Sequence, residues 1–224
     1  MALLRLPLMP LNNVVFPGMP IPLALWEPRY LQMAEHCAEE GSEFGVVLIR
    51  EGPEIGQEPV TTHHVGTTAA IAEVRDVGDH TMMFAVGRRR FRIIRPINGS
   101  PYPQAEVQLL PETRRTGVSS EFLEDIRAVF TEQIDLILQL LGLDGVTLDI
   151  PQRADKLSYM IAAHLRVSLA EKQELLEMDD TRQRLAHEME TMRRETKEYR
   201  LLLAAREQVT DTGGEATGSA FSDN

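Results

Sequence analysis

A serine and a lysine that could form a hydrolytic pair stand four residues apart in this 224-residue chain. Ser168 and Lys172 have the spacing that places two side chains on one face of a helix, so a Ser-Lys nucleophile is one hypothesis. The same serine begins the sequence Ser-Leu-Ala-Glu, a capping box that ends at Glu171. Because helix capping explains Ser168 without catalysis, we predict no catalytic residue here. A hydrolase stays the less favoured alternative, and it would lose its activity in Ser168→Ala.

The histidines and the single cysteine lack the grouping that a metal site or a cysteine nucleophile needs. His63 and His64 are adjacent, and adjacent side chains on a strand point to opposite faces. His36 and Cys37 are expected within a helix, as a surface histidine beside a small apolar residue. A closed metal site needs three or four ligands, and the chain has no Gly-Lys dipeptide, G-x-G-x-x-G, H-E-x-x-H or G-x-S-x-G. We therefore predict no metal and no cofactor.

The basic cluster Arg88–Arg95 has two interpretations. Strand alternation places Arg88, Arg90 and Arg92 on one face, with Phe91 and Ile93 on the other. That face could contact nucleic-acid phosphates, or it could be a solvated face paired with nearby carboxylates. The chain has 34 acidic and 23 basic residues and a net charge of −11, which opposes binding to a polyanion. RNA binding through these three arginines is therefore the alternative function, and nucleic acid the less favoured partner.

Composition places the chain among globular proteins of the cytoplasm. It is 43% hydrophobic and 25% charged, with one cysteine and so no internal disulfide. The N-terminus is interrupted by Arg5, Pro7 and Pro10, which is unlike a signal peptide. The longest unbroken apolar runs are five residues, whereas a membrane span needs about 20. We expect a soluble cytoplasmic protein with no membrane partner.

The two halves of the chain differ in the elements that they predict. Residues 1–112 hold 12 of the 13 prolines, and their apolar runs predict short strands around one helix from Pro28 to about Glu40. The strands are expected at residues 3–8, 21–25, 44–49, 66–76, 81–86, 90–97 and 104–110. Residues 119–207 are predicted to be helical, and residues 208–224 a flexible tail. The fold class is therefore α+β, a mostly antiparallel barrel or sandwich followed by helices.

Four helices are predicted in the second half. One covers residues 119–141, one is marked by Leu157, Ile161 and Leu165, and one begins at Ser168 and ends near residue 178. The last covers residues 180–207, with Asp179 as its cap. Its apolar seam has heptad-like spacing and is formed by Leu185, Met189, Met192, Thr196, Tyr199 and Leu203. The seam predicts packing within its own bundle, with a dimer through residues 185–203 as the alternative.

Several short motifs occur in the order and spacing of a known family. They are Leu6–Leu11, Val15–Met19, Pro22–Tyr30, Phe44–Val47, Val65–Thr67, Ala85–Arg92 and Pro101–Tyr102, followed by Glu171–Glu177 and Arg184-Leu185. On these residues the chain resembles the N-terminal substrate-binding domain of Lon ATP-dependent proteases (peptidase S16 family), the LON domain. The resemblance covers about residues 3–207. Trp26 stands where the family usually has phenylalanine.

The resemblance implies a PUA-like six-stranded pseudo-barrel and then a helical bundle with a long C-terminal helix. Since the 224 residues contain no AAA+ or protease module, the chain is similar to stand-alone LON-domain proteins of bacteria, and no enzyme is expected. The expected function is binding of unfolded or apolar peptide segments, or of a protein partner such as a protease in trans, at the barrel–helix interface. The candidate binding residues are Phe16, Pro17, Trp26, Glu27, Arg29 and Tyr30.

Overall fold

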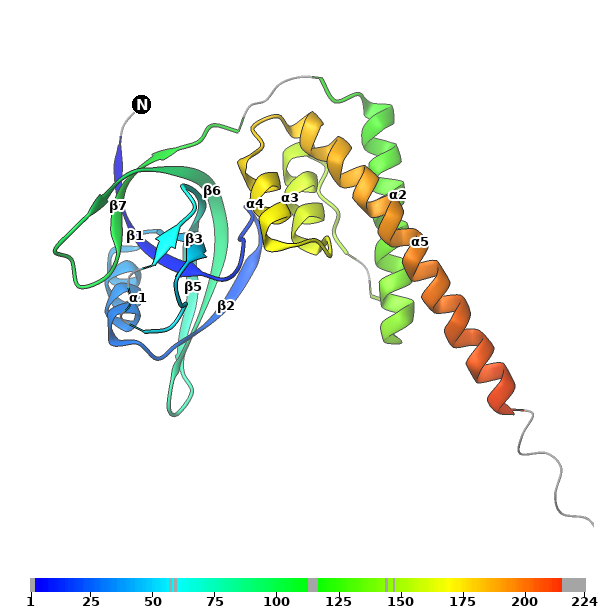
Figure 1. The fold of residues 1–224 in the computed structure, drawn as a ribbon, viewed down its shortest axis with the longest axis horizontal. Helices are drawn as coiled ribbons and strands as arrows, with labels where there is room; N and C mark the ends of the chain where they lie inside the picture. Colours follow the sequence, from blue (N-terminus) through cyan, green and yellow to red (C-terminus); the bar gives the residue numbers. More distant parts are fainter. Residues whose placement is uncertain are drawn as a thin grey trace, which may run out of the picture.

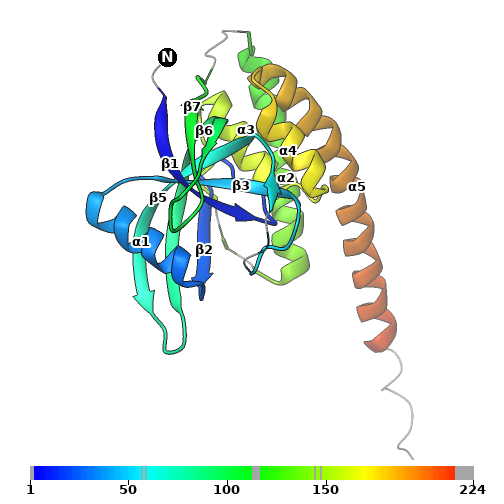
Figure 2. The ribbon, with the colours of Figure 1, turned by 60° about the vertical axis from the view of Figure 1, so that its left-hand side comes forward.

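The structure, a computed structural model, combines a β-barrel with a group of helices (Figures 1 and 2). It describes residues 3–214 except 57, 59, 113–116, 144 and 147, and it leaves out the side chains of 207 and 209–214. Helix α1 (Pro28–Glu40) lies on the side of the barrel away from the other helices in both views. The predicted α+β class is confirmed.

Five strands close the barrel because the first one has a partner on each side. β1 pairs in parallel with β3 and antiparallel with β7, and β6 and β5 complete the ring. Together with β2, which pairs with β6, these strands give the six of the expected pseudo-barrel; the two-residue β4 adds to β3. Their bounds are Leu4–Leu11 (β1), Pro20–Leu25 (β2), Phe44–Glu51 (β3), Thr61–Thr62 (β4), Val65–Asp76 (β5), Thr81–Ile97 (β6) and Gln104–Leu109 (β7).

Strand β6 differs from the prediction, which divided it into 81–86 and 90–97. It is one strand of 17 residues that continues through Gly87. A Cβ at Gly87 would overlap the carbonyl oxygen of Phe16. Glycine inside a strand often marks the close approach of another backbone rather than the end of the strand, and here it admits the 16–19 turn.

The barrel and the helices share one hydrophobic cluster. Val14, Phe16 and Val65 of the barrel side pack in the same cluster as Leu157 and Leu185 of the helical side. A second cluster fills the barrel against α1, which begins at Pro28 and ends at Gly41 as predicted. A third cluster, around Phe91, lies between β1, β3, β6 and β7. The shared cluster means that the helices do not pack as a separate body beside the barrel.

The four helices after the barrel are α2 (Ser120–Leu141), α3 (Ala154–His164), α4 (Leu169–Glu177) and α5 (Thr181–Gly214). The capping box predicted at the start of α4 is present, with Ser168 and Glu171 each accepting from the other's backbone N–H. No described helix combines the length and apolar character needed to cross a bilayer.

Both predicted ends of α5 need correction. Asp180, not Asp179, caps the helix: its Oδ1 accepts from the N–H groups of Arg182 (2.9 Å) and Gln183 (3.3 Å). Asp179 is instead 3.1 Å from Arg90 Nη2. The helix continues to residue 214 rather than 207, since adding a residue to an existing helix avoids the cost of nucleation. The predicted tail begins within α5, and residues 215–224 lie outside the described part.

The heptad-like seam of α5 packs inside its own chain. Its first five members are buried, and the helices that it faces are α2 and α3 of the same molecule. The members are Leu185, Met189, Met192, Thr196 and Tyr199. Intramolecular packing was the favoured prediction for this seam. A dimer through the same residues would have to displace α2 and α3.

The tight contact at Gly66 gives a test of the barrel core. A Cβ there would overlap the carbonyl oxygen of Val46 and press on Val47 and Phe91. We expect Gly66→Ala to lower the free energy of unfolding by about 1–3 kcal/mol, as overpacking does. Chemical denaturation measures this change in the free energy of unfolding. Gly117→Ala is the matched control, because a Cβ at Gly117 meets no atom within 4 Å; equal losses in the two variants would contradict the barrel packing described here.

Candidate functional site

A buried arginine connects the barrel to the helices. Arg90 of β6 is fully buried, and its Nη1 donates to the carbonyl oxygens of Leu176 (2.9 Å) and Met178 (3.0 Å). Its Nε donates to Glu112 Oε1 at 3.2 Å, and Asp179 is its second carboxylate partner. The carbonyls at a helix C-terminus have no partner within the helix. Arg90 thus supplies donors to the end of α4 and places α4 against β6.

The burial of Arg90 corrects the proposed nucleic-acid face. Side chains alternate between the two faces of β6 as predicted, so Arg90 and Phe91 point in opposite directions. Both of these side chains are nevertheless buried, because other parts of the protein cover both faces of the strand at this point. Arg88 and Arg92 remain exposed. Alternation predicts which side chains share a face and not what covers that face. The three arginines therefore do not form a continuous solvent-facing row.

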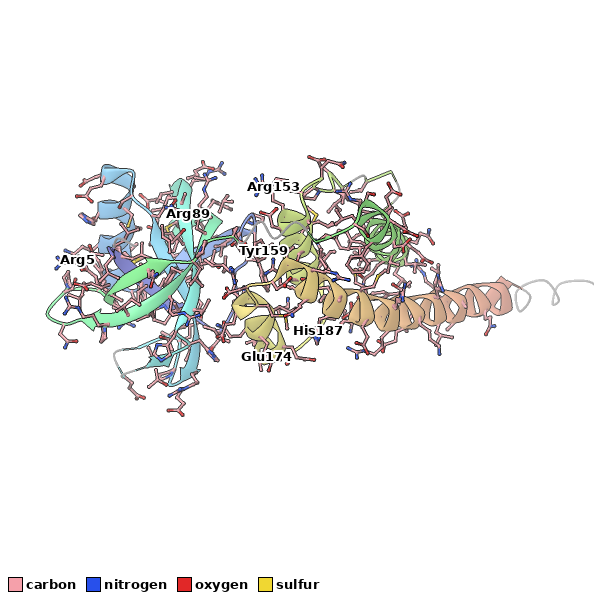
Figure 3. All side chains as sticks on the ribbon, turned by 90° about the horizontal axis from the view of Figure 1, so that it is seen from above. Arg5, Arg89, Arg153, Tyr159, Glu174 and His187 are labelled. Carbon is pink, nitrogen blue, oxygen red and sulfur yellow. The ribbon has the colours of Figure 1, made fainter. Side chains whose placement is uncertain are left out.

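Tyr159 of α3 extends this junction into the helical bundle. Its hydroxyl lies 2.8 Å from both carboxylate oxygens of Glu112, and the Arg184 guanidinium is 4.2 Å above its ring. Arg184 Nη1 donates to the carbonyl of Met178 at 2.7 Å. Burial raises the pKa of Tyr159, so the hydroxyl keeps its proton and donates to Glu112. Figure 3 shows Tyr159 between the barrel and the helices.

A buried carboxyl group forms the inner end of the same network. Arg184 Nε donates to Ser158 Oγ at 2.7 Å, and the Ser158 hydroxyl donates to Glu188 Oε1 at 2.8 Å. Burial raises the pKa of Glu188 to about 8, against the opposing effect of Arg184. Charges in an apolar interior lose their hydration. Glu188 is therefore held in the folded protein as the neutral acid at neutral pH.

A groove of about 600 Å³ lies beside this network, between the barrel and α3. One wall comes from the turn before β2 and from the middle of β6, and it includes Pro17, Met19, Pro20, Val86 and Arg88. The other wall comes from α3, where Lys156, Met160 and Ala163 follow helical spacing. The lining is completed by Gly18, Gly87, Glu112, Pro151, Arg153, Asp155, Tyr159 and His164.

The barrel wall of the groove is made by two of the motifs noted in the sequence. The Pro17-Gly18 turn lies on Gly87: the Gly18 N–H donates to the Gly87 carbonyl at 2.8 Å, and the Gly87 N–H donates to the Met19 carbonyl at 2.9 Å. Phe16 points into the core, with its ring centre 6.3 Å from that of Tyr159. The turn and the strand are thereby fixed against each other and against α3.

The six predicted binding residues do not come together. Phe16 is fully buried, and Pro17 lines the groove. Trp26, which is 59% exposed, lines a separate hollow of about 250 Å³ together with Glu27 and Tyr30. Only Pro17 of the six therefore lines the barrel–helix groove.

Arg29 lines neither the barrel–helix groove nor the hollow at Trp26. Its Nη2 is 2.8 Å from Glu27 Oε2 and donates to the Gly56 carbonyl at 2.6 Å. Its guanidinium lies 4.7 Å from the centre of the Tyr30 ring. These contacts attach the start of α1 to the loop that contains Gly56, which is a structural role.

The groove residues on α3 were not predicted, because the helix was identified from Leu157, Ile161 and Leu165 alone. Lys156, Met160 and Ala163 form a second stripe, beside the buried one marked by Leu157 and Ile161. The spacing of this stripe is visible in the sequence. Its opposition to β6 is not, because it depends on the tertiary packing of two distant segments.

The remaining chemical candidates are engaged elsewhere. Ser168 Oγ lies 2.7 Å from Glu171 Oε2, whereas Lys172 Nζ donates to the Ala163 carbonyl at 3.1 Å, so the two do not form a pair. Cys37 is buried, and burial raises the pKa of its thiol. His63 Nδ1 is 3.8 Å from a Glu177 oxygen. Within the described residues no three His, Cys, Asp or Glu side chains are grouped to hold a metal ion.

Comparison with known proteins gives one consistent family. The model of the ATP-dependent protease La (LON) substrate-binding domain matches residues 5–194. "Lon protease 2" of Syntrophobacter fumaroxidans is 29% identical over 208 residues, 92% of this chain and 26% of that protein. "Lon protease 2" of Myxococcus xanthus is 28% identical over 84% of this chain and 23% of its own length. The chain thus spans about a quarter of the curated relatives that it matches.

Solved structures show the same arrangement. A Lon N-terminal domain protein from Xanthomonas campestris superposes with a TM-score of 0.61 and 28% identity, covering 82% of this chain and 96% of that one. The N-terminal domain of Lon protease from the Mycobacterium avium complex gives a TM-score of 0.59 over 84% of this chain and 97% of that one. At 23% identity, the second match supports the fold alone.

The role of Arg90 can be tested against a neighbour on the same strand. Arg90→Met leaves Glu112 without its cation and removes the side-chain donor of the Leu176 carbonyl, while the Met178 carbonyl keeps its donor Arg184. We expect the free energy of unfolding to fall by about 3–5 kcal/mol. Arg90→Lys keeps the positive charge but loses the branched donor geometry of the guanidinium group. Its free energy of unfolding should lie between those of the wild type and Arg90→Met. Chemical denaturation measures all three proteins.

Arg92→Met is the control for Arg90. The Arg92 side chain is exposed and forms no hydrogen bond or ion pair with another described residue. Its loss should therefore change stability by no more than about 0.5 kcal/mol. Similar effects of the two substitutions would contradict the role given to Arg90.

Glu188 predicts a pH dependence of stability with a definite sign. Between the ordinary pKa of 4.5 and the folded-state value of about 8, the folded protein holds a proton that the unfolded chain has released. The free energy of unfolding should therefore fall as pH rises through this window. Glu188→Gln, which keeps an acceptor for Ser158, should flatten that slope and raise the melting temperature at pH 8. Glu190→Gln, at an exposed position of α5, should leave the slope unchanged; a flattening there and not at Glu188 would refute the assignment.

Proposed function

The chain belongs to the LON substrate-binding domain family, and from this premise we propose that it is a non-catalytic module that binds apolar segments of unfolded polypeptides in the groove between the barrel and α3. The observation that carries the proposal is the groove itself. Its walls present Met19, Pro20, Val86, Met160 and Ala163, and apolar surface in a concave site is the usual basis for binding an apolar ligand.

The rigidity of the two walls supports this choice of site. Arg90 and the Glu112–Tyr159 contact hold α3 and α4 against β6. A groove that exists before binding requires little ordering of the protein when a segment enters it. The hollow at Trp26 is smaller, at about 250 Å³, and we give it no part in the proposal.

Binding without catalysis is part of the proposal. The matched family model is a substrate-binding domain, and the chain spans about a quarter of the related Lon proteases. We infer that bound segments are retained or passed to a protein partner, a protease in trans being one candidate. The side chains of Ser168 and Lys172 each bond to other groups, so no hydrolytic step is assigned to them.

A peptide-binding assay tests this function. A fluorescent, unstructured peptide with an apolar core and no charged side chains is titrated with the full chain, and single-stranded RNA of similar length is titrated in parallel. We expect saturable peptide binding with little salt dependence and no RNA binding. Met160→Asp should weaken peptide binding about tenfold, because burying a methionine side chain is worth about 1.5–3 kcal/mol.

The control places the same charge at an apolar residue outside the groove. Leu202→Asp changes a 53%-exposed side chain of α5 and should bind the peptide as the wild type does, with melting curves verifying that both variants are folded. Absence of peptide binding, or equal losses in both variants, would overturn the proposed site. Salt-sensitive RNA binding without peptide binding would replace the proposed function with nucleic-acid recognition.

A further inference from the structure

We propose that the groove selects apolar segments that carry acidic side chains, an inference that rests on the proposed function and adds the chemistry of its ligand. The groove is lined by both cations and carboxylates, but the two signs are not equally available. The carboxylates are engaged by the protein itself, whereas two of the cations have no hydrogen-bond or ion-pair partner among the described residues.

Both acidic residues of the lining have partners. Glu112 receives the Tyr159 hydroxyl at 2.8 Å and Arg90 Nε at 3.2 Å. Asp155 lies 2.6 Å from Arg153 Nη2, with a second contact from Arg153 Nε at 3.1 Å. This paired arrangement lowers the pKa of Asp155, and it also neutralises Arg153. Neither carboxylate is left to attract or repel a ligand strongly.

The two cations without partners lie on opposite walls. Arg88 follows Gly87 on β6, and Lys156 stands one helical turn before Met160 on α3. Both side chains are exposed, and neither forms a hydrogen bond or ion pair with another described residue. A segment whose apolar side chains contact Met160 and Val86 would therefore pass between the Arg88 guanidinium group and the Lys156 ammonium group at the rim of the groove.

The charge of the whole chain makes this local arrangement selective. The net charge of −11 repels an acidic segment at long range. The positive groups at the groove reverse that effect locally. Lysine-bearing segments would meet repulsion from Arg88 and Lys156 without a free carboxylate to compensate. Discrimination of this kind uses repulsion of the wrong ligand as well as attraction of the right one.

Three labelled peptides with one apolar core test the proposal. Their flanking residues are Asp and Glu, the neutral Asn and Gln, or Lys. We expect the acidic peptide to bind the full chain about tenfold more tightly than the neutral one at low salt, since two exposed ion pairs each contribute about three- to fivefold. The advantage should shrink as salt screens the charges. The Lys peptide should bind most weakly.

Matched variants assign the advantage to particular residues. Arg88→Ala and Lys156→Ala should each lower the ratio of the affinity for the acidic peptide to that for the neutral peptide by about three- to fivefold. Lys156→Glu should shift the preference towards the Lys peptide. Arg89→Ala and Lys197→Ala remove equal charges at exposed sites outside the groove lining and should keep the ratio. Arg92→Ala removes a free arginine from another hollow, which also contains Arg50 and two histidines, and should keep it too.

The outcomes separate this inference from the function on which it rests. Equal binding of the acidic and neutral peptides would overturn the preference while leaving the groove as a binding site. Loss of the acidic preference in Arg92→Ala, with no change in Arg88→Ala or Lys156→Ala, would overturn it by placing the acidic contact elsewhere. Binding of none of the three peptides would remove the proposed function as well.

Discussion

The burial of one guanidinium group sets the geometry on which the rest of the structure depends. Arg90 stands on a barrel strand, and its acceptors are the end of α4, Asp179 and Glu112. A fully buried cation is tolerated only where its lost hydration is replaced by several well-placed acceptors. The helices therefore cannot shift along the barrel without leaving that charge unpaired. The barrel–helix groove follows from this constraint, since its two walls are the strand that carries Arg90 and the helix that contacts Glu112 through Tyr159.

The network continues through residues that have no exposed surface and no place in the groove. Arg184 contacts the Tyr159 ring and the Met178 carbonyl, and Ser158 connects it to Glu188. Each member restricts the rotation or translation of α3 relative to α5. Because buried polar groups are costly when only partly satisfied, the position of α3 is specified more sharply than apolar packing alone would require. A wall that is held this way presents its outer stripe, with Lys156 and Met160, in one orientation.

Local signals in the sequence were sufficient for most elements and insufficient for the site. Pro28, Gly41 and the Ser168–Glu171 capping box mark ends that depend on neighbouring residues only. Asp179 was predicted to cap α5, but it pairs with Arg90, far away along the chain, and Asp180 caps the helix instead. The continuation of β6 through Gly87 likewise depends on the approach of Phe16. The groove combines a turn, a strand and a helix, so no single segment could have predicted its lining.

Stability and the proposed recognition are carried by different atoms of the same elements. On β6, Arg90 and Phe91 are buried and hold the two halves together. Arg88 instead lines the groove and forms no hydrogen bond or ion pair with another described residue. On α3, Ser158 and Tyr159 join the buried network, whereas Lys156 and Met160 face the groove. Exposed substitutions away from buried networks usually have small effects on folding. The charge and shape of the groove rim can therefore change with little effect on the fold. This separation would let a binding module of constant architecture accept different apolar segments, with selectivity determined by a few rim side chains.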